Sequence, residues 1–211
     1  MLRLLSVALT LAATCLLSSC HMLGHTPQKD KYQALFSELS PSLDVLGARN
    51  WIVIADPAYP ILAGEGVDVL TVDADIPTTL RAVLNKLEQE GTLTPRLWVC
   101  NELEQLTEKR APGVRRHRRE LNRLISRELH YEMTDRIISL QLTQAAQTYR
   151  ILYIKTTTAL PYSTVAIELD SGYWDSDDEA ELRERMEKLN APQPARPLPH
   201  LPTAADTQQG V

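Results

Sequence analysis

The run of five apolar residues at Trp51–Ala55, WIVIA, most constrains the fold of this 211-residue chain. Such a run suits a strand that is buried on both faces, whereas a strand with one face in water alternates apolar and polar residues. A sheet that contains a strand of this kind needs helices on both sides, because each of its faces must be covered. The sequence therefore predicts a layered α/β domain.

Helical spacing and short apolar runs alternate along the rest of the chain. Helices are predicted over residues 32–39, 76–87, 114–133 and 135–149 and from Ser176 onward, and further strands over 96–100, 151–154 and 164–169. We expect Pro41 to end the first helix and Gly91 to follow the second. Leu182, Met186 and Leu189 are expected to form the buried side of the last helix. The alternation predicts three layers, with a mainly parallel or mixed sheet flanked by helices.

The predicted helix over residues 114–133 is strongly basic. Its apolar stripe consists of Leu121, Leu124, Ile125 and Leu129, and the arginines around that stripe are Arg115, Arg116, Arg118, Arg119, Arg123 and Arg127. This pattern is typical of a helix that has one face in solvent. We expect His117, which lies among the arginines, to be a solvated surface histidine and not a catalytic one.

The first twenty residues have the features of a bacterial lipoprotein signal. Arg3 precedes an apolar stretch from Leu4 to Leu17, which leads through two serines to Cys20. A stretch of about 14 residues is short for a membrane span, which needs about 20, so an uncleaved anchor is the less favoured alternative. We expect residues 1–19 to be removed as a signal peptide. Cys20 would then carry the lipid that anchors the protein at a membrane of the cell envelope.

The ends of the mature chain are predicted to lack regular structure. Residues 20–31 have no periodicity and are interpreted as a tether. Residues 191–211 are predicted to be a disordered tail, with a proline-rich ligand for a partner as the alternative, because they contain Pro192, Pro194, Pro197, Pro199 and Pro202. Residues 32–190 would form one α/β domain. Cys100 is the single cysteine that remains beside Cys20, so no intrachain disulfide is expected.

The composition of the chain and the positions of its histidines argue against a nucleic-acid partner and against a metal site. A net charge of −5 and a single phenylalanine argue against a general polyanion binder with base-stacking side chains, so no nucleic-acid partner is expected. His21, His25 and His200 lie in the predicted terminal segments, so we expect no metal site.

Polar residues stand next to two of the predicted strands. Asp56 follows Trp51–Ala55, at the strand end where α/β sheets favour ligands. A carboxylate there can accept hydrogen bonds from hydroxyl groups or transfer a proton, although an aspartate that closes a turn before Pro57 is an equally good interpretation. Tyr162 precedes another predicted strand, and Thr164 is the first residue of that strand. They offer a phenol and a hydroxyl, with core or interface packing as the alternative for Tyr162.

Three stretches of the chain carry a family resemblance. Residues 46–60, LGARNWIVIADPAYP, resemble the opening signature of the D-ribose pyranase and L-fucose mutarotase family, which reads roughly Leu-Gly-His-x-Asp, an apolar strand, an Asp and a nearby Pro. Asp73–Pro77 is similar to the next join before a helix, and Lys155–Ile167 to the family's last strands. The similarity covers most of the chain from Leu35 to Leu169.

The resemblance implies a sugar-interconverting enzyme that needs no cofactor or metal and assembles as a ring with its site between subunits. It implies Asp56 and Tyr162 as the catalytic residues, with Thr164 in the place of the family's asparagine. Ala48 occupies the place of the catalytic histidine. Arg49 and Tyr59, together with Thr164, are the residues expected to bind the substrate.

Two functional hypotheses follow from the sequence. The first is an exported enzyme that interconverts ring or anomeric forms of a monosaccharide such as ribose or fucose by acid/base proton transfer. The second is a non-catalytic sugar-binding or structural envelope lipoprotein that retains the fold. The alanine at position 48 favours the second, because histidine is the side chain best suited to proton transfer near neutral pH.

Overall fold

A computed structural model describes residues 27–174 and 176–190. The predicted signal peptide, Cys20, the first part of the tether and the proline-rich tail lie outside these residues. The chain divides into two compact units, Met1–Tyr173 and Trp174–Val211, and each unit is described by itself.

The first unit contains one mixed sheet and the helices that cover it. Its strands are β1 (Trp51–Ala55), β2 (Val67–Thr71), β3 (Leu93–Cys100), β4 (Leu129–Met133), β5 (Ile151–Lys155) and β6 (Val165–Ser171). Its described helices are α2 (Pro27–Leu43), α3 (Ile76–Glu90), α4 (Glu102–Gln105), α5 (Val114–Ile125) and α6 (Asp135–Ala145).

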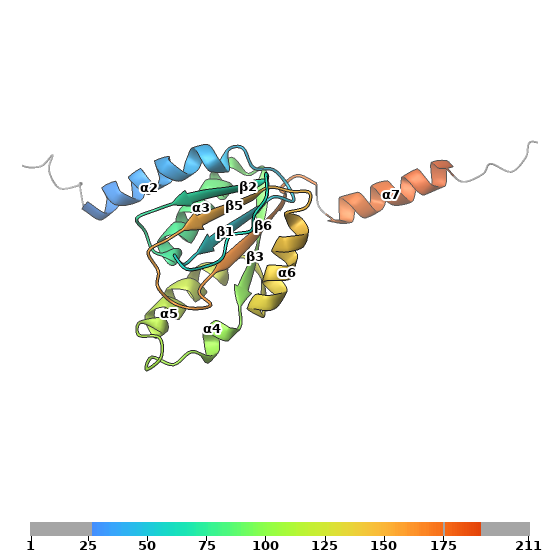
Figure 1. Ribbon diagram of the computed structural model, residues 1–211. Coiled ribbons are helices and arrows are strands. Elements are labelled where there is room, and N and C mark those ends of the chain that lie inside the picture. Colours follow the sequence, from blue (N-terminus) through green and yellow to red (C-terminus); the bar gives the residue numbers. More distant parts are fainter. Residues whose placement is uncertain (1–26, 175, 191–211) are drawn as a thin grey trace, which may run out of the picture. The chain divides into compact units, whose positions relative to one another are not determined.

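The six strands lie in the order β2-β5-β1-β6-β3-β4 (Figure 1). β5 runs parallel to both β1 and β2, and β3 runs parallel to β4. β6 is antiparallel to its two neighbours, β1 and β3. The strands other than β6 therefore end at the same edge of the sheet, which is also where β6 begins. We call it the carboxyl edge.

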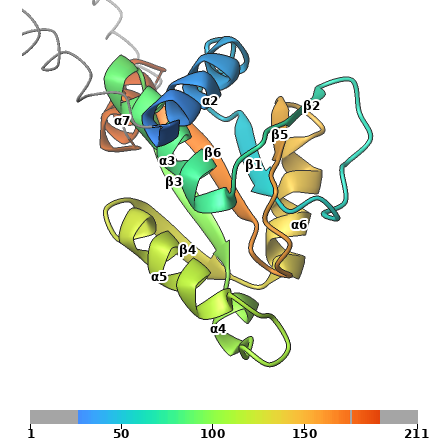
Figure 2. The ribbon, with the colours of Figure 1, turned by 90° about the vertical axis from the view of Figure 1, so that its left-hand side faces the viewer.

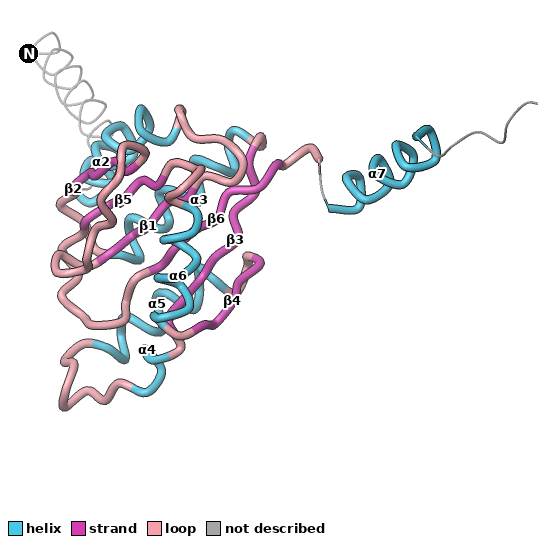
Figure 3. Tube along the Cα trace, turned by 45° about the vertical axis from the view of Figure 1, so that its right-hand side comes forward, coloured by secondary structure: helices cyan, strands magenta, loops and turns pink. Residues whose placement is uncertain are grey.

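Alternation along the strands divides the core into two layers. Ile52 and Ile54 pack with the buried faces of α2, α3 and α5, whereas Trp51, Val53 and Ala55 pack with α6. Figure 2 shows α3 and α5 on one side of the sheet and α6 on the other, and in Figure 3 α6 crosses in front of the strands. All five residues of β1 are buried, as the continuous apolar run predicts. The three-layer α/β fold predicted from the sequence is confirmed.

Local signals define both ends of α3. The Asp75 side chain caps its first turn by accepting the Thr78 main-chain N–H at 2.8 Å. Pro77 lies in the first turn, where a missing N–H costs nothing. Gly91 ends the helix with φ of 66°, a left-handed conformation that glycine adopts without a Cβ penalty.

The prediction of a single helix over residues 114–133 is wrong. α5 ends at Ile125, and Leu129–Met133 forms β4, which pairs in parallel with β3. Leu129 continues the helical spacing of the apolar stripe, but it is 57% exposed on this edge strand. Its spacing therefore matched a helix by coincidence, because a short edge strand has too few residues to show its own period.

Two smaller differences concern α2 and β2. Pro41 lies inside α2, which continues to Leu43, since a proline in the last turn removes only one helical hydrogen bond. β2 was not predicted. β2, with the sequence VDVLT, is the outermost strand on the side of the sheet opposite to β4, and none of its residues is fully buried. It therefore lacks the continuous apolar run that identifies β1.

The second unit is described by a single helix, α7 (Ser176–Asn190). Within the described residues of this unit, the expected buried side of the helix is absent, since Leu182, Met186 and Leu189 are 36%, 45% and 77% exposed. Ion pairs four residues apart, such as that between Glu181 and Arg185 at 2.8 Å, support the helix instead. Among the helices in the described part of the chain, none is long and apolar enough to cross a membrane.

Candidate functional site

Asp56 lies at the carboxyl edge, directly after β1. One of its carboxylate oxygens accepts the main-chain N–H of Ala58 at 2.8 Å, so the side chain closes a turn, as the alternative interpretation predicted. The carboxylate is half-buried. Its other lone pairs leave it able to bind a hydroxyl group from a ligand.

Lys155, the last residue of β5, holds the loop that follows Asp56. Its ammonium group donates hydrogen bonds to the main-chain oxygens of Asp56 at 3.2 Å, of Pro57 at 3.4 Å and of Tyr59. Lys155 is only 9% exposed. Burial lowers the pKa of its ammonium group, and the negative charge of Asp56 opposes that shift. The three donors of the ammonium are thus used to fix the position of the loop.

Tyr59 connects this loop to the α6 side of the sheet. Its ring packs against Tyr153 with 6.4 Å between the ring centroids. Burial raises the pKa of the Tyr59 phenol to about 12, although a hydrogen bond with Ser139 of α6 opposes the shift. The phenol therefore stays protonated at neutral pH and can donate or accept a hydrogen bond.

Asp135, the first residue of α6, brings a second carboxylate to the same place. Its main-chain N–H donates to both carboxylate oxygens of Glu102 at 3.1 Å. Burial raises the pKa of the Asp135 carboxyl, and the nearby charges of Glu102 and Asp56 raise it further. A hydrogen bond from Cys100, with 3.8 Å between Sγ and Oδ1, opposes the shift. The charge of Asp56 therefore influences the Asp135 carboxyl at the carboxyl edge.

Cys100 is unsuited to be a nucleophile. It is the last residue of β3 and is buried. Burial, followed by the charges of Asp135 and Glu102, raises the pKa of its thiol to about 12. The thiolate is the reactive form of cysteine, so this side chain acts only as a donor to Asp135 near neutral pH.

Tyr162 and Thr164 reach the carboxyl edge from the opposite direction. Val165 of β6 pairs with Ile54 of β1 and Val99 of β3, so Thr164 lies between the ends of those strands. Thr164 is 2% exposed, and its hydroxyl has no hydrogen-bond partner within the described residues. Tyr162 is 43% exposed and has φ of 57°, a left-handed conformation that is unusual for a tyrosine and strained.

Arg49 is not part of this group of residues. It precedes β1, and its main-chain N–H donates to the Leu169 carbonyl at 2.6 Å, near the end of β6. Its guanidinium group donates to the Tyr149 hydroxyl at 3.4 Å. Seven residues along an extended strand separate Arg49 from Asp56 by roughly 20 Å. Asp56, Tyr59, Tyr162 and Thr164 thus lie at the carboxyl edge. Arg49 lies at the opposite end of the strands, where β1 begins.

The expectation for His117 is wrong. The side chain is 6% exposed in the buried face of α5, and its Nε2 has no hydrogen-bond partner among the described residues. Burial lowers the pKa of His117, and the charges of Asp75 and Glu120 oppose the shift. Among the described residues, no group of three or more His, Cys, Asp or Glu side chains could hold a metal ion.

The sequence matches the model of the RbsD / FucU transport protein family over residues 29–172. The chain belongs to this family. The resemblance that the sequence predicted is thereby confirmed. No curated protein matches the chain.

Solved structures of other RbsD and FucU proteins are similar to this chain at low identity. RbsD of Bacillus subtilis, complexed with D-ribose, is 21% identical over 64% of this chain and 92% of its own, with a TM-score of 0.45. The fucose mutarotase of Streptococcus pneumoniae, in complex with L-fucose, is 14% identical over 63% and 90%, with a TM-score of 0.42. FucU of Bifidobacterium longum is 17% identical over 64% and 94%, with a TM-score of 0.39.

Sequence reasoning missed three residues of this candidate site, namely Lys155, Cys100 and Asp135. Lys155 and Cys100 each end a strand, so the strand-end rule that selected Asp56 also applies to them. Asp135 was missed for a different reason. The wrong prediction of one helix over residues 114–133 concealed β4, and with it the carboxyl-edge position of the residues that follow β4.

Proposed function

We propose that the carboxyl edge binds a monosaccharide and exchanges its ring or anomeric forms by proton transfer through Asp56 and Asp135. The observation that carries the proposal is that Asp56 follows β1 and Asp135 follows β4 at the same carboxyl edge, where the charge of Asp56 contributes to the raised pKa of Asp135. Pairs of titratable groups whose environments differ are suited to divide acid and base roles. Membership of the RbsD/FucU family supports a monosaccharide as the ligand.

Exchange of sugar anomers requires two proton transfers. Asp56, as carboxylate, would accept the proton of the anomeric hydroxyl, while Asp135, in its protonated form, would donate a proton to the ring oxygen. The bond between the anomeric carbon and the ring oxygen then breaks and leaves an open-chain aldehyde. The former ring oxygen, now a hydroxyl group, then attacks the other face of the aldehyde. It returns its proton to Asp135 while Asp56 returns its proton to the aldehyde oxygen, and this gives the other anomer. In this scheme Asp56 and Asp135 together replace the family's catalytic histidine, whose place Ala48 occupies.

The proposed function is tested by NMR of the full chain with D-ribose and with L-fucose. When the NMR signal of one ring form is saturated, the saturation should transfer to the signal of the other ring form faster with the protein than without it. Saturation transferred from the protein to the sugar, without faster exchange, would support the second hypothesis of a sugar-binding protein. The absence of both effects would sink the proposal for these two sugars.

Tyr162→Gly should weaken sugar binding without loss of stability. Glycine tolerates φ of 57°, so relief of the left-handed strain, about 1 kcal/mol, roughly offsets the entropy that glycine loses on folding. Arg49→Gly is the matched control, because Arg49 has φ of 70° but lies at the other edge. Thermal unfolding and sugar titration would be measured for both variants. Equal loss of sugar affinity in the two would remove Tyr162 from the site.

We also propose that a lipid on Cys20 anchors the chain at a membrane of the cell envelope. The apolar stretch that ends in Leu-Ser-Ser-Cys supports this proposal. When the full chain is expressed in a bacterium, it should partition with membranes, and mass spectrometry should find acyl chains on Cys20. The Cys20→Ser variant should lack this modification. An unmodified Cys20 in the membrane-associated protein would contradict the anchor.

A further inference from the structure

The solvent-facing side of α5 carries a row of arginines. Arg115, Arg119, Arg123 and, in the turn after the helix, Arg127 follow one another at a spacing of four residues, with Arg116 beside them. All five side chains are exposed. We call these five residues the arginine stripe. Because residues four apart are neighbours on a helix, their like charges repel and destabilise the isolated helix.

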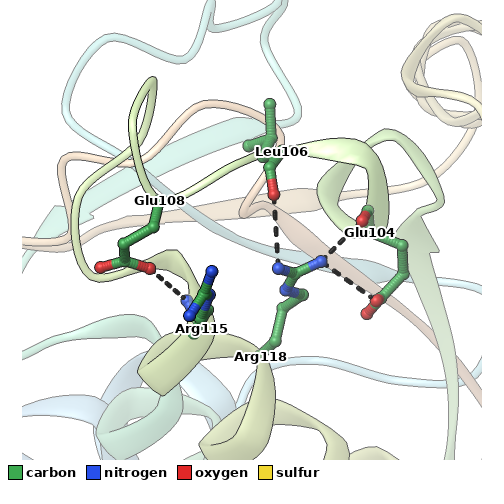
Figure 4. Close-up of polar contacts among 5 residues, drawn as sticks. All are labelled: Glu104, Leu106, Glu108, Arg115 and Arg118. Atoms are coloured by element: carbon green, nitrogen blue, oxygen red, sulfur yellow. Dashed lines mark hydrogen bonds and ion pairs between the residues drawn. The ribbon is translucent and has the colours of Figure 1, made fainter.

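The described residues neutralise only a small part of this charge, through the attraction between Glu108 and Arg115. Arg118, on the flank of α5, donates to the Glu104 carboxylate at 3.3 Å and to the Leu106 carbonyl at 3.3 Å (Figure 4), and no ion pair to a described carboxylate exists for the stripe. Glu108 serves as a cap, since its carboxylate accepts the main-chain N–H of Gly113 at 2.5 Å and that of Arg115 at 3.2 Å, the second of which is drawn in Figure 4. The charge of the stripe is thus available to an outside partner.

The opposite face of α5 limits how that partner can be bound. Val114, Leu121 and Ile125 are 0%, 2% and 6% exposed and belong to the core under the sheet. The helix therefore has no apolar face to insert into a hydrocarbon layer, unlike a free amphipathic helix. A partner would meet a row of guanidinium groups about 18 Å long, which can form paired hydrogen bonds with phosphate oxygens.

We propose that the arginine stripe docks on a phospholipid surface that carries anionic headgroups. The choice of a membrane over another polyanion rests on the lipid anchor proposed above. Six residues lie between Cys20 and the start of α2 at Pro27, and the seven steps from Cα to Cα span at most about 25 Å. An anchored domain would consequently remain beside the membrane, where several arginines can contact phosphate groups together. The net charge of −5 opposes attraction of the whole chain to polyanions in solution.

Vesicle binding tests this proposal without the lipid anchor. The full chain with Cys20→Ala would be titrated with phosphatidylcholine vesicles, either pure or with about a quarter of phosphatidylglycerol. The pure vesicles report any binding by the apolar N-terminal segment. Each arginine near an anionic surface strengthens binding by about fivefold, so Arg119→Gln with Arg123→Gln should weaken binding to the anionic vesicles roughly 25-fold. The preference of the protein for anionic over pure phosphatidylcholine vesicles should vanish when the salt concentration rises from about 0.01 M to about 1 M.

The control variant removes the same charge elsewhere. Arg136 is an exposed residue of α6, and Arg150 is an exposed residue that directly precedes β5, so Arg136→Gln with Arg150→Gln should change binding little. Equal binding to both kinds of vesicle, or an equal loss in the control, would overturn the proposal. So would tighter binding to a single-stranded oligonucleotide than to anionic vesicles. Failure of the sugar or lipidation experiments leaves this measurement unaffected, because it uses neither sugar nor lipidated protein.

Discussion

Replacement of Asp135 by asparagine is expected to slow sugar exchange by about 10²- to 10⁴-fold, which is the usual contribution of a positioned acid or base. Asparagine keeps the size of the side chain but has no proton to donate to the ring oxygen. Stability should not fall. The raised pKa of Asp135 means that its charged form is disfavoured in the folded protein. The contribution of Asp135 to the free energy of unfolding therefore declines as pH rises through that pKa. A neutral asparagine avoids this loss.

Exchange NMR together with thermal unfolding separates the two effects. Wild-type exchange should decrease as pH rises through the raised pKa of Asp135, because the acid form is lost, and this decrease should be absent in the variant. Asp73→Asn makes the same chemical change at an exposed residue that follows β2 at the carboxyl edge, and it should exchange sugar at the wild-type rate. A fully active Asp135→Asn protein would exclude Asp135 as the acid.

The second large effect is expected for Lys155→Met, which should lower the free energy of unfolding by about 2 kcal/mol. Methionine has a similar length but cannot donate to the main-chain oxygens of Asp56, Pro57 and Tyr59. Methionine also removes the cost of burying a charge, which the lowered pKa of Lys155 indicates. This gain offsets part of the stability lost with the hydrogen bonds. The loop would also become less ordered, so sugar exchange should fall with stability.

Urea unfolding at neutral pH would measure this change. Lys109→Met is the matched control, because Lys109 is exposed in the segment between α4 and α5. It should unfold like the wild type. If Lys155→Met also had wild-type stability and activity, the loop after β1 would be held by other contacts, and Lys155 would not position Asp56.

Several features of the fold were predictable because they depend on local patterns. The apolar run of β1 requires cover on both faces, and Asp75 with Gly91 marks the two ends of α3. The family motif around Asp56 is also local, since it lies in one continuous stretch of sequence. Such signals act over a few residues, so the order of residues alone was enough to predict them.

Patterns failed where two periods coincide or where a strand is short and exposed. The apolar stripe of α5 continues by chance into Leu129, and β2 lacks a buried run. Asp135 was missed for a related reason, because the predicted helix over residues 114–133 concealed β4. Lys155 follows a strand that was predicted, but its contact with the loop after β1 depends on the pairing of β5 beside β1.

The sequence by itself determined the layered α/β class, the family and the position of Asp56 after a buried strand. Only the tertiary structure decided that Asp56 shares an edge with Asp135 and Thr164 and that Arg49 lies at the other edge. The physical reason is that hydrophobic periodicity reports which faces are buried. Strand order and direction, in contrast, arise from pairing between segments as far apart as β1 and β5, whose contacts leave no periodic trace in either segment.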